Sequence, residues 1–382
     1  MSSGASDRSR ITPASRFEGI ELSLIRQIQA LATPASINLG LGEPNLEPDE
    51  HLLDLARNAA TEGDWRYTPN AGSSSLRRAI ADATGIVEDQ EVCVTAGTQE
   101  GLFATLLAFV NPGDEVLLPD PGFVAYPTVV RLVGGIPVPY PLDPGTWRLD
   151  PASIRSRVTR RTRAIIVNSP SNPTGAVATA EALAEVAELA DQRHLLVVSD
   201  EVYRELYDQA LPPTMLGLTS NAITLQGLSK SHGITGLRIG WAIGNRALMP
   251  TIIKAHQFIT TCASSFSQRL AEMILNSGEW NAGWLARARQ QIRDQREVAL
   301  SAIESHLDTR IQRPDGAFYL FTPIPRCDSL SLARELATIA GVLTIPGIAF
   351  GGAGEGFLRI SCAADPGTLV EGISRIGRHL GR

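Results

Sequence analysis

The chain has 382 residues, which predicts two domains or one large domain with an attached lobe. Hydrophobic residues make up 43% and charged residues 19%, a composition that excludes a disordered chain, a coiled coil and collagen. The net charge is -6 and no basic stripe is visible, so nucleic acid is not expected as a partner.

The sequence also argues against several cellular settings. The N-terminal stretch MSSGASDRSR is polar and is not expected to be a secretory signal. No run of 18 apolar residues predicts a membrane span. The scattered Cys93, Cys262, Cys327 and Cys362 form no CxxC pair, which indicates reduced core thiols in a cytoplasmic protein. The histidines lack HExxH spacing, so no metal site is predicted.

From about residue 75 onward, helix-like and strand-like stretches alternate. In chain order we expect a helix at 75–83, a strand at 91–95, a helix at 99–110, a strand at 115–118, a helix through 130, and strands at 164–168, 195–199, 223–225 and 239–243. The runs at 164–168, 195–199 and 223–225 are continuously apolar, as in strands covered on both faces. This alternation predicts an α/β fold with a mainly parallel sheet, whose ligand lies at the carboxyl ends of the strands.

Past residue 284 the pattern changes. A long amphipathic helix at 285–306 leads to short strands at 318–321 and 357–360, which predicts a smaller α+β domain. We therefore expect residues 1–48 to form an N-terminal arm and part of the small domain, residues 49–283 to form the large domain, and residues 284–382 to form the small C-terminal domain.

Lysine occurs only at Lys230 and Lys254. Lys230 lies in LQGLSKSHGITGLRIGW, between two predicted strands and eight residues before Arg238. An amine and a guanidinium at one sheet edge suit a phosphorylated carbonyl ligand, with lysine forming a Schiff base and arginine binding phosphate. A lysine in a polar loop is more often a solvated charge, and the motif alone leaves that alternative open.

Two further polar motifs follow predicted strands. In LLVVSDEVYREL, Asp200 either caps a following helix or keeps a ring nitrogen protonated, while Tyr203 donates to a nearby phenolate. In AIIVNSPSNPTG, Asn172 stands in a proline-flanked turn, which is ordinary turn chemistry on its own.

Two motifs suggest anion binding. VTAGTQEGLF reads as a strand, a glycine turn and a helix N-terminus, whose exposed N–H groups attract anions, and no GK[ST] follows to make a P-loop. In FLRIS, Arg359 lies within an apolar strand. A buried arginine needs a partner, either a carboxylate of the protein or a carboxylate of a ligand.

Taken in this order, the motifs resemble the class I/II aminotransferases, which are pyridoxal-phosphate enzymes of fold type I. The resemblance covers nearly the whole chain, in INLGLGEPN, YTPNAGSSSLRRAI, VTAGTQEGL, NPTG, SDEVY, SKSHGITGLRIG, GAFYLF and RIS. It implies that the large domain binds the cofactor. It also implies transfer of an amino group between an L-amino acid and a 2-oxo acid in amino acid metabolism, by a cytoplasmic homodimer.

The resemblance implies a role for each matched residue. Lys230 is the catalytic residue, which forms a Schiff base with pyridoxal 5′-phosphate and later moves the proton. Asp200 pairs with the pyridine nitrogen, which makes the ring an electron sink. Tyr203 and Asn172 hydrogen-bond the ring oxygen, and Phe123 stacks on the ring face.

The resemblance also implies contacts to the two acidic groups of the reactants. The cofactor phosphate is held by backbone amides and side chains: Gly97, Thr98, Gln99, Ser229 and Arg238. The substrate α-carboxylate is taken by Arg359 with help from Asn172 and the amide of Gly42. Tyr67 matches a tyrosine that reaches the phosphate of the neighbouring subunit. Gly227 departs from the pattern, since many relatives carry a phosphate-binding Ser or Thr there.

Two alternatives to an aminotransferase deserve weight. A C–S β-lyase on the same scaffold needs the same lysine, aspartate and arginine. A transcription regulator with an aminotransferase-like domain carries a long helix-turn-helix arm, which we do not expect because INLGLGEPN arrives by about residue 40.

We expect a substrate with a neutral, apolar or aromatic side chain. A dicarboxylate needs a second cation beyond Arg359, because an unpaired buried carboxylate is costly. Thr98 stands where some aspartate-using relatives place lysine, and residues 255–268 contain no Arg or Lys. The expected wall of the substrate pocket is apolar or aromatic: Phe17, Ile20 and Tyr126. The cations that could still reach it are Arg16 and Arg66.

Overall fold

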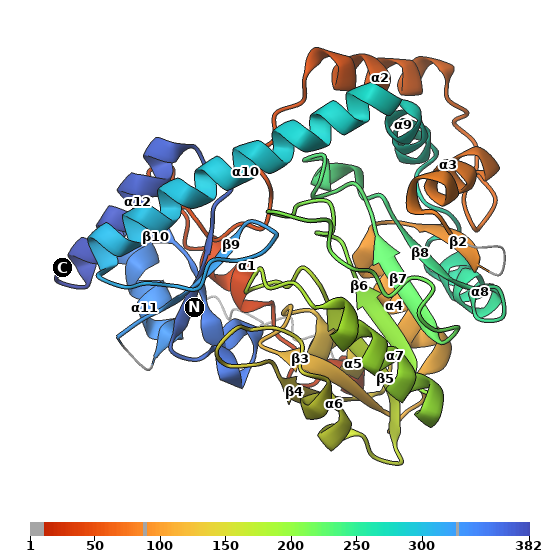
Figure 1. The fold of residues 1–382 in the computed structure, drawn as a ribbon, viewed down its shortest axis with the longest axis horizontal. Helices are drawn as coiled ribbons and strands as arrows, with labels where there is room; N and C mark the ends of the chain where they lie inside the picture. The colour runs from red at the N-terminus through yellow and green to blue at the C-terminus, as the bar shows by residue number, and fades with distance from the viewer. Residues whose placement is uncertain (1–10, 87–89, 326–327) are drawn as a thin grey trace, which may run out of the picture.

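The computed structural model describes residues 11–86, 90–325 and 328–382, and its largest element is a seven-stranded sheet of order β2-β8-β7-β6-β5-β3-β4 (Figure 1). The strands are β2 (Gln90–Thr95), β3 (Glu115–Asp120), β4 (Ile136–Pro141), β5 (Thr162–Asn168), β6 (Leu196–Asp200), β7 (Ala222–Gln226) and β8 (Gly240–Asn245). Neighbours from β4 to β7 run parallel, whereas β8 is antiparallel to β2 and β7. The predicted α/β sheet is confirmed as mainly parallel, with β8 as its antiparallel member.

Eight helices among the described residues surround this sheet: α2 (Glu50–Glu62), α3 (Ser74–Thr84), α4 (Thr98–Phe109), α5 (Tyr126–Leu132), α6 (Pro151–Arg157), α7 (Ala180–Arg193), α8 (Met249–Thr260) and α9 (Ser265–Asn276). Local signals set their ends. For example, Ser73 accepts a hydrogen bond from the N–H of Leu76 at the start of α3, and Gly85 ends the helix with φ of 65°.

The two faces of the sheet are covered by different helices. In β5, Ala164 and Ile166 pack in a cluster with α4, α5 and α8, whereas Ile165 and Val167 pack in a cluster with α6 and α7. Successive side chains of a strand point to opposite faces, so a strand buried on both sides needs apolar residues at every position. This explains the continuous apolar runs in the sequence.

The smaller lobe is built on a second sheet, of order β11-β12-β9. Its elements are α10 (Gly278–Leu307), β9 (Tyr319–Pro323), α11 (Ser329–Glu335), β10 (Val342–Leu343), β11 (Ile345–Pro346), β12 (Phe357–Ser361) and α12 (Pro366–His379). Near the N-terminus, α1 (Leu24–Gln29) precedes β1 (Ile37–Asn38), which pairs in parallel with β10. Figure 1 shows α10 running from beside α9 to α12, so one helix joins the two parts.

The predicted elements occur within a few residues of their expected positions, with one larger shift. The helix expected at 285–306 begins at Gly278. The strand β4 was not predicted, because its sequence IPVPYP contains three prolines. Proline lacks a backbone N–H and is confined to edge strands, and β4 is an edge strand of the large sheet.

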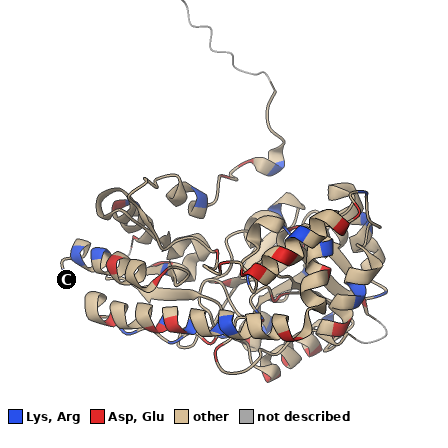
Figure 2. Cartoon of the chain, turned by 90° about the horizontal axis from the view of Figure 1, so that it is seen from above, with Lys and Arg blue, Asp and Glu red and all other residues tan. Residues whose placement is uncertain are grey.

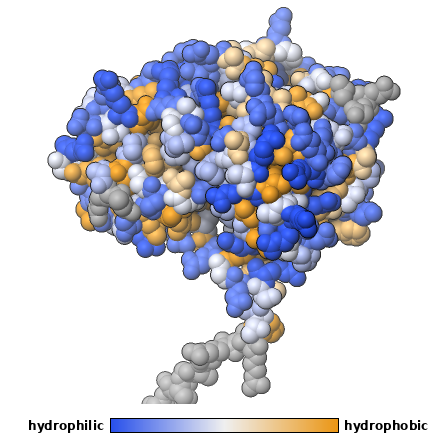
Figure 3. Space-filling model, turned by 60° about the horizontal axis from the view of Figure 1, so that its bottom comes forward, coloured by the Kyte–Doolittle hydropathy of each residue, from blue (hydrophilic) through white to orange (hydrophobic). Residues whose placement is uncertain are grey.

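The surface carries mixed charge and a few exposed aromatic side chains. Figure 2 shows basic and acidic residues interspersed along the visible helices, and Figure 3 shows apolar residues in small groups between polar ones. The most exposed aromatic side chains include Tyr67 (87%), Phe258 (82%) and Trp65 (76%). In the described ranges no helix is long and apolar enough to cross a membrane.

The cysteine prediction is confirmed only in part. Cys93 and Cys362 are free and buried, whereas Cys262 is free and only half-buried, so it is not a core thiol. Cys327 and the polar N-terminal stretch 1–10 lie outside the described residues. Within the part of the chain that the structure describes, no group of three His, Cys, Asp or Glu side chains is placed to hold a metal ion.

Candidate active site

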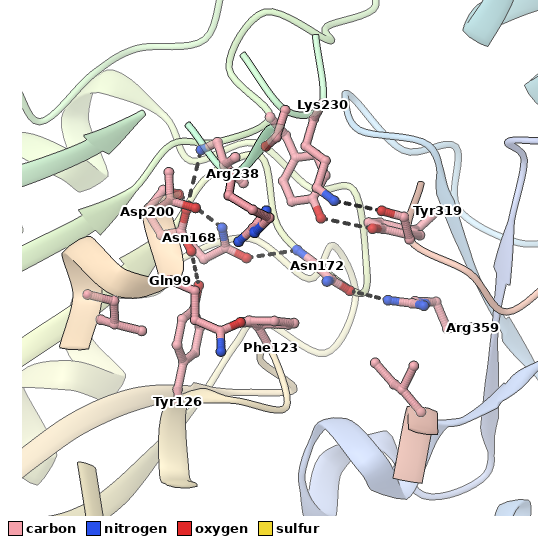
Figure 4. Close-up of a pocket in the computed structure, with 17 residues that line it drawn as sticks. Gln99, Phe123, Tyr126, Asn168, Asn172, Asp200, Lys230, Arg238, Tyr319 and Arg359 are labelled. Carbon is pink, nitrogen blue, oxygen red and sulfur yellow. Dashed lines mark hydrogen bonds between the residues drawn. The ribbon is translucent and has the colours of Figure 1, made fainter. Parts of the chain in front are cut away.

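A cavity lies at the carboxyl ends of the parallel strands, where the large sheet meets the small lobe (Figure 4). Eleven of the predicted site residues line it: Gly42, Thr98, Gln99, Phe123, Asn172, Asp200, Tyr203, Ser229, Lys230, Arg238 and Arg359. Figure 4 shows Asp200 and Arg359 on opposite sides with Asn172 between them. Asp200 ends β6 of the large sheet and Arg359 lies in β12 of the small sheet, so the two sides of the cavity come from different sheets.

Lys230 is held in the cavity by a backbone carbonyl. Its Nζ donates a hydrogen bond of 2.7 Å to the carbonyl oxygen of Gly42, which belongs to the N-terminal segment. Burial lowers the pKa of Lys230 to about 8, a shift that nearby Arg238 and Arg359 reinforce and Glu43 opposes. A lysine with a lowered pKa is more often a neutral amine, which is the form that attacks a carbonyl.

Asp200 ends β6 and is buried. Its Oδ2 accepts a hydrogen bond of 2.8 Å from the hydroxyl of Tyr126, and its Oδ1 accepts one of 3.3 Å from the N–H of Val202. Burial raises the pKa of Asp200 to about 6, while these hydrogen bonds oppose the rise. The helix-cap alternative is wrong, because the chain makes a turn and not a helix after Asp200.

Two of these contacts were not foreseen in the sequence. Tyr126 lines the cavity as expected, but the hydrogen bond from its hydroxyl to Asp200 was not predicted. Asn168, at the end of β5, donates from Nδ2 to the carbonyl of Asp200 and accepts from the N–H of Asn172 at 2.8 Å. The signal for Asn168 was present, since it directly follows the apolar run of β5.

A pair of tyrosines closes another side of the cavity. The hydroxyls of Tyr203 and Tyr319 share a hydrogen bond of 2.8 Å, and the Arg359 guanidinium lies 4.3 Å from the Tyr319 ring centroid. Burial raises the pKa of both phenols, so both stay protonated and can donate. Tyr319 was not predicted, although its motif GAFYLF was part of the resemblance.

Arg359 is 1% exposed. Its Nη1 donates to Oδ1 of Asn172 at 2.9 Å and its Nη2 donates to the carbonyl of Gly40 at 2.6 Å. Among the described residues no carboxylate forms an ion pair with it, and its Nε has no partner. The protein-carboxylate alternative is therefore not realised among the described residues, although a buried arginine without a counter-ion is costly.

A narrow turn before α4 lies against Arg238. A Cβ at Gly97, where φ is 87°, would lie 2.6 Å from Nη2 of Arg238, and a Cβ at Gly240 would lie 2.8 Å from the nitrogen of Thr98. The backbone N–H of Gly97 donates to Thr95, so Gly97 contributes space and not the amide that we expected. The first amides of α4 and the Arg238 guanidinium thus lie together at one corner of the cavity, called the anion-binding corner below because such groups attract anions.

Phe123 and Ser229 also line the cavity. Phe123 lies in the turn after β3 and meets the Tyr126 ring edge-on, with centroids 5.5 Å apart. Gly122, just before it, donates its N–H to the carbonyl of Phe350 at 2.8 Å, which ties this turn to the small lobe. Ser229, next to Lys230, is buried.

Some predicted residues are not brought to the cavity. Tyr67 is exposed and does not line it. Phe17, 53% exposed, and Ile20 do not line it either, so this part of the predicted wall is wrong. Ile25 of α1 lines the cavity instead. Nothing in the sequence pattern singled out Ile25. The two arginines named as possible cations, Arg16 and Arg66, are also exposed and outside the cavity.

Comparison with known proteins agrees with this architecture. The family model for aminotransferase class I and II matches residues 34–376. The aspartate aminotransferase of Pyrococcus horikoshii is 31% identical over 380 residues, covering 96% of this chain and 97% of that relative. The aromatic-amino-acid aminotransferase 2 of Thermococcus litoralis is 33% identical over 384 residues, covering 96% and 97%. The solved structure of the Thermus thermophilus aspartate aminotransferase with maleate has a TM-score of 0.90 at 30% identity, covering 96% of this chain and 99% of that one.

A large α/β domain, a smaller lobe and a cavity at the carboxyl ends of the strands define an enzyme of fold type I. The chain belongs to the class I and II aminotransferases. Enzymes of this family use pyridoxal phosphate to transfer amino groups. The protein is accordingly an aminotransferase, and the family predicted from the motifs is confirmed.

Proposed function

We propose that this aminotransferase binds pyridoxal 5′-phosphate through Lys230 and acts on an L-amino acid with a neutral, apolar or aromatic side chain and a 2-oxo acid. The arrangement of four groups around one cavity carries the proposal. The Lys230 amine suits an aldehyde, Asp200 suits a pyridine nitrogen, the corner at Arg238 suits a phosphate, and Arg359 suits an α-carboxylate.

The lysine and the aspartate have protonation states that fit this chemistry. When bound, pyridoxal phosphate supplies an aldehyde that bonds to an amine and a ring that accepts electrons. Lys230, with a pKa of about 8, is partly neutral near physiological pH and can attack that aldehyde or carry a proton at its Nζ. Asp200, with a pKa of about 6, is mostly ionised at neutral pH and can hold a positive charge on the ring nitrogen.

The remaining contacts orient the reactants. Oδ1 of Asn172 accepts from Arg359, so its Nδ2 is the group that can donate to a ring oxygen. Tyr203 can donate to the same oxygen, since Tyr319 can accept or donate at the other end of the pair. The guanidinium of Arg359 is fixed by two hydrogen bonds before any substrate binds, which lowers the entropy cost of binding a carboxylate.

The substrate side chain is proposed to be neutral because each cation on the cavity has another role. The lining cations are Lys230, Arg238 and Arg359, whereas Ile25 and Phe123 are apolar. Arg26 lies only in the outer part of the opening, where Glu21 and Glu43 are also found. The named relatives include both aspartate and aromatic-amino-acid enzymes, so the choice rests on the cavity itself.

A donor screen tests the proposal. The purified protein is mixed with single amino acids, and loss of the cofactor–lysine absorbance is followed. We expect phenylalanine, leucine or methionine to exceed aspartate in kcat/KM with a common acceptor. Aspartate ahead by about tenfold, or about 1.4 kcal/mol in transition-state binding, would contradict the neutral pocket. Lys230→Ala should abolish turnover, and Lys230→Arg should do no better because a guanidinium stays protonated.

The β-lyase alternative is less well supported. The relatives reported above are all named aminotransferases. A lyase would release ammonia and a 2-oxo acid from a cysteine conjugate without an amino acceptor, and we expect no such release.

We also propose that the working unit is a cytoplasmic homodimer, with Tyr67 of one subunit reaching the phosphate in the other. Three aromatic side chains near this loop are exposed in the single chain: Trp65, Tyr67 and Phe258. Exposed apolar groups of this size are typical of a surface that a second subunit covers. The loop that carries Tyr67 is tied to the end of α8, since Asn70 donates to the carbonyl of Thr261 at 2.8 Å. The division into 1–48, 49–283 and 284–382 is kept as a proposal, supported by the β1–β10 pairing.

A further inference from the structure

A half-buried glutamate and a buried histidine lie next to the anion-binding corner. Glu100 is on the first turn of α4, and His256 is on α8, which packs beside α4 (Figure 1). Nδ1 of His256 lies 3.0 Å from Oε2 and 3.1 Å from Oε1 of Glu100. A histidine ring nitrogen can donate a hydrogen bond to a carboxylate, so Nδ1 of His256 is placed to hold both oxygens of Glu100.

This pair borders an apolar cluster. The His256 side chain is fully buried and the Glu100 side chain is 12% exposed. The neighbouring cluster between α4, α8 and the sheet contains Cys93, Leu102 and Ile252. Nε2 of His256 has no partner among the described residues. A buried polar pair that leaves one nitrogen unpaired costs free energy, so it is not explained by stability alone.

Glu100 also binds the turn before its own helix. Its Oε2 accepts a hydrogen bond of 3.2 Å from the backbone N–H of Ala96. Glu100 is the third residue of α4, and a glutamate there commonly reaches back to an amide at the helix start. The difference here is that the N-cap is Gly97, which has no side chain to bind the first amides.

The hydrogen bonds of the turn therefore divide into two sets. The N–H of Ala96 goes to Glu100 and the N–H of Gly97 goes to Thr95. The N–H groups of Thr98 and Gln99 belong to the first turn of α4, where no intrahelical acceptor exists. The carboxylate thus fixes the turn from behind and leaves the amides at its front for an anion.

We propose that Glu100 and His256 are positioning residues that fix the turn at Ala96–Thr98 and thereby set the affinity of the chain for the phosphate of its cofactor. This inference rests on the proposed function, since it concerns the phosphate of pyridoxal phosphate. His256 holds both oxygens of Glu100, and Glu100 holds the N–H of Ala96. The turn then presents its remaining amides opposite Arg238, whose guanidinium lies against Gly97.

The test uses two probes that differ only in the phosphate, pyridoxal 5′-phosphate and pyridoxal. Their dissociation constants are measured on the ligand-free full chain by the absorbance of the lysine adduct. We expect Glu100→Ala to raise the constant for pyridoxal phosphate about tenfold, or about 1.4 kcal/mol, and to leave the constant for pyridoxal nearly unchanged. Glu100→Gln should keep most of the affinity, because an amide oxygen can still accept from Ala96.

A buried carboxylate elsewhere provides the control. Glu115 is 4% exposed, begins β3 and accepts a hydrogen bond from Thr159. The strands β8, β7, β6 and β5 separate β3 from β2 in the large sheet, so Glu115→Ala removes a carboxylate far from the turn. It should leave the ratio of the two constants unchanged. If Glu100→Ala does not fold, His256→Gln gives the same comparison, with a smaller expected rise of about fivefold.

The outcomes separate the two proposals. The measured quantity is the dissociation constant for pyridoxal phosphate divided by that for pyridoxal. If this ratio rises in the Glu100 or His256 variants but not in Glu115→Ala, the positioning role is supported. If the ratio stays unchanged, whether neither probe or both probes bind more weakly, the positioning role is overturned. A wild-type chain that binds neither probe would instead overturn the proposed cofactor, and with it the function on which this inference rests.

Discussion

The hydroxyl of Tyr126 donates a hydrogen bond of 2.8 Å to the Asp200 carboxylate and joins α5 to the end of β6. This bond acts against burial, because it favours the ionised form of an acid whose pKa is raised to about 6. Asp200 can hold a positive ring nitrogen only while it is ionised. Tyr126 therefore controls the pH range in which Asp200 can act.

We predict that Tyr126→Phe raises the pKa of Asp200 by about one unit, the size expected for one hydrogen bond to a charged group. A raised pKa leaves more Asp200 protonated at low pH, so activity should fall more at pH 6 than at pH 8, and the acid limb of kcat/KM should move upward. The control is Tyr140→Phe, since Tyr140 is equally buried and donates to the carbonyl of Ile166 instead. Equal loss at all pH values in both variants would contradict the prediction.

The lowered pKa of Lys230 predicts how the stability of the ligand-free protein depends on pH. The folded-state pKa is about 8 and the ordinary value is 10.5, so between these values the unfolded chain binds more protons. Stability contributed by this group therefore rises as the pH increases from about 8 to 10.5. At pH 7 the burial of a charged amine destabilises the folded state.

Lys230→Met removes that charge. We expect the variant to be more stable than the wild type by about 2 kcal/mol at pH 7, and the difference to shrink as the pH approaches about 10. Urea unfolding of the ligand-free proteins at both pH values measures it. Lys254→Met, which changes the only other lysine, an exposed one, is the matched control.

We predict that a hydroxyl side chain at position 227 weakens cofactor binding in this chain, although many relatives carry one there. A Cβ at Gly227 would lie 2.9 Å from Cα of Gly240 and 3.0 Å from the carbonyl oxygen of Ile239. Gly227→Ser should therefore weaken pyridoxal phosphate binding several-fold, because the backbone of β8 must move. Gly236→Ser is the matched control, since no atom lies within 4 Å of its added Cβ. Tighter binding in Gly227→Ser would show that the added hydroxyl outweighs the contact.

We predict that Tyr67 of one subunit contributes to the cofactor affinity of the other. If Tyr67 binds the phosphate of a neighbouring chain, Tyr67→Phe should weaken cofactor affinity by about 1 kcal/mol, the net value of one hydrogen bond. Trp65→Phe, at another exposed aromatic side chain of the same loop, should leave the affinity unchanged. Light scattering on the same samples gives the oligomeric state. A fully active monomer would refute the proposal.

The sequence determined the family and most of the cavity lining, because these depend on local features. Strands with apolar residues at every position, such as 164–168, must be covered on both faces, and parallel strands end at one sheet edge. Lys230, Asp200 and Asn172 each follow such a strand or its turn, so their convergence could be anticipated before any contact was known.

Contacts between distant segments were decided only by the tertiary structure. Tyr126 looked like an apolar wall residue, yet its hydroxyl reaches an acid 74 positions away. Glu100 was not singled out in the sequence, and its partner His256 lies 156 positions away. Ile25 lines the cavity, whereas Phe17 is exposed and does not. The sequence pattern does not show which residue of the N-terminal segment reaches the cavity. Hydrophobic periodicity reports which face of an element is buried, and only packing in three dimensions decides which side chain it meets there.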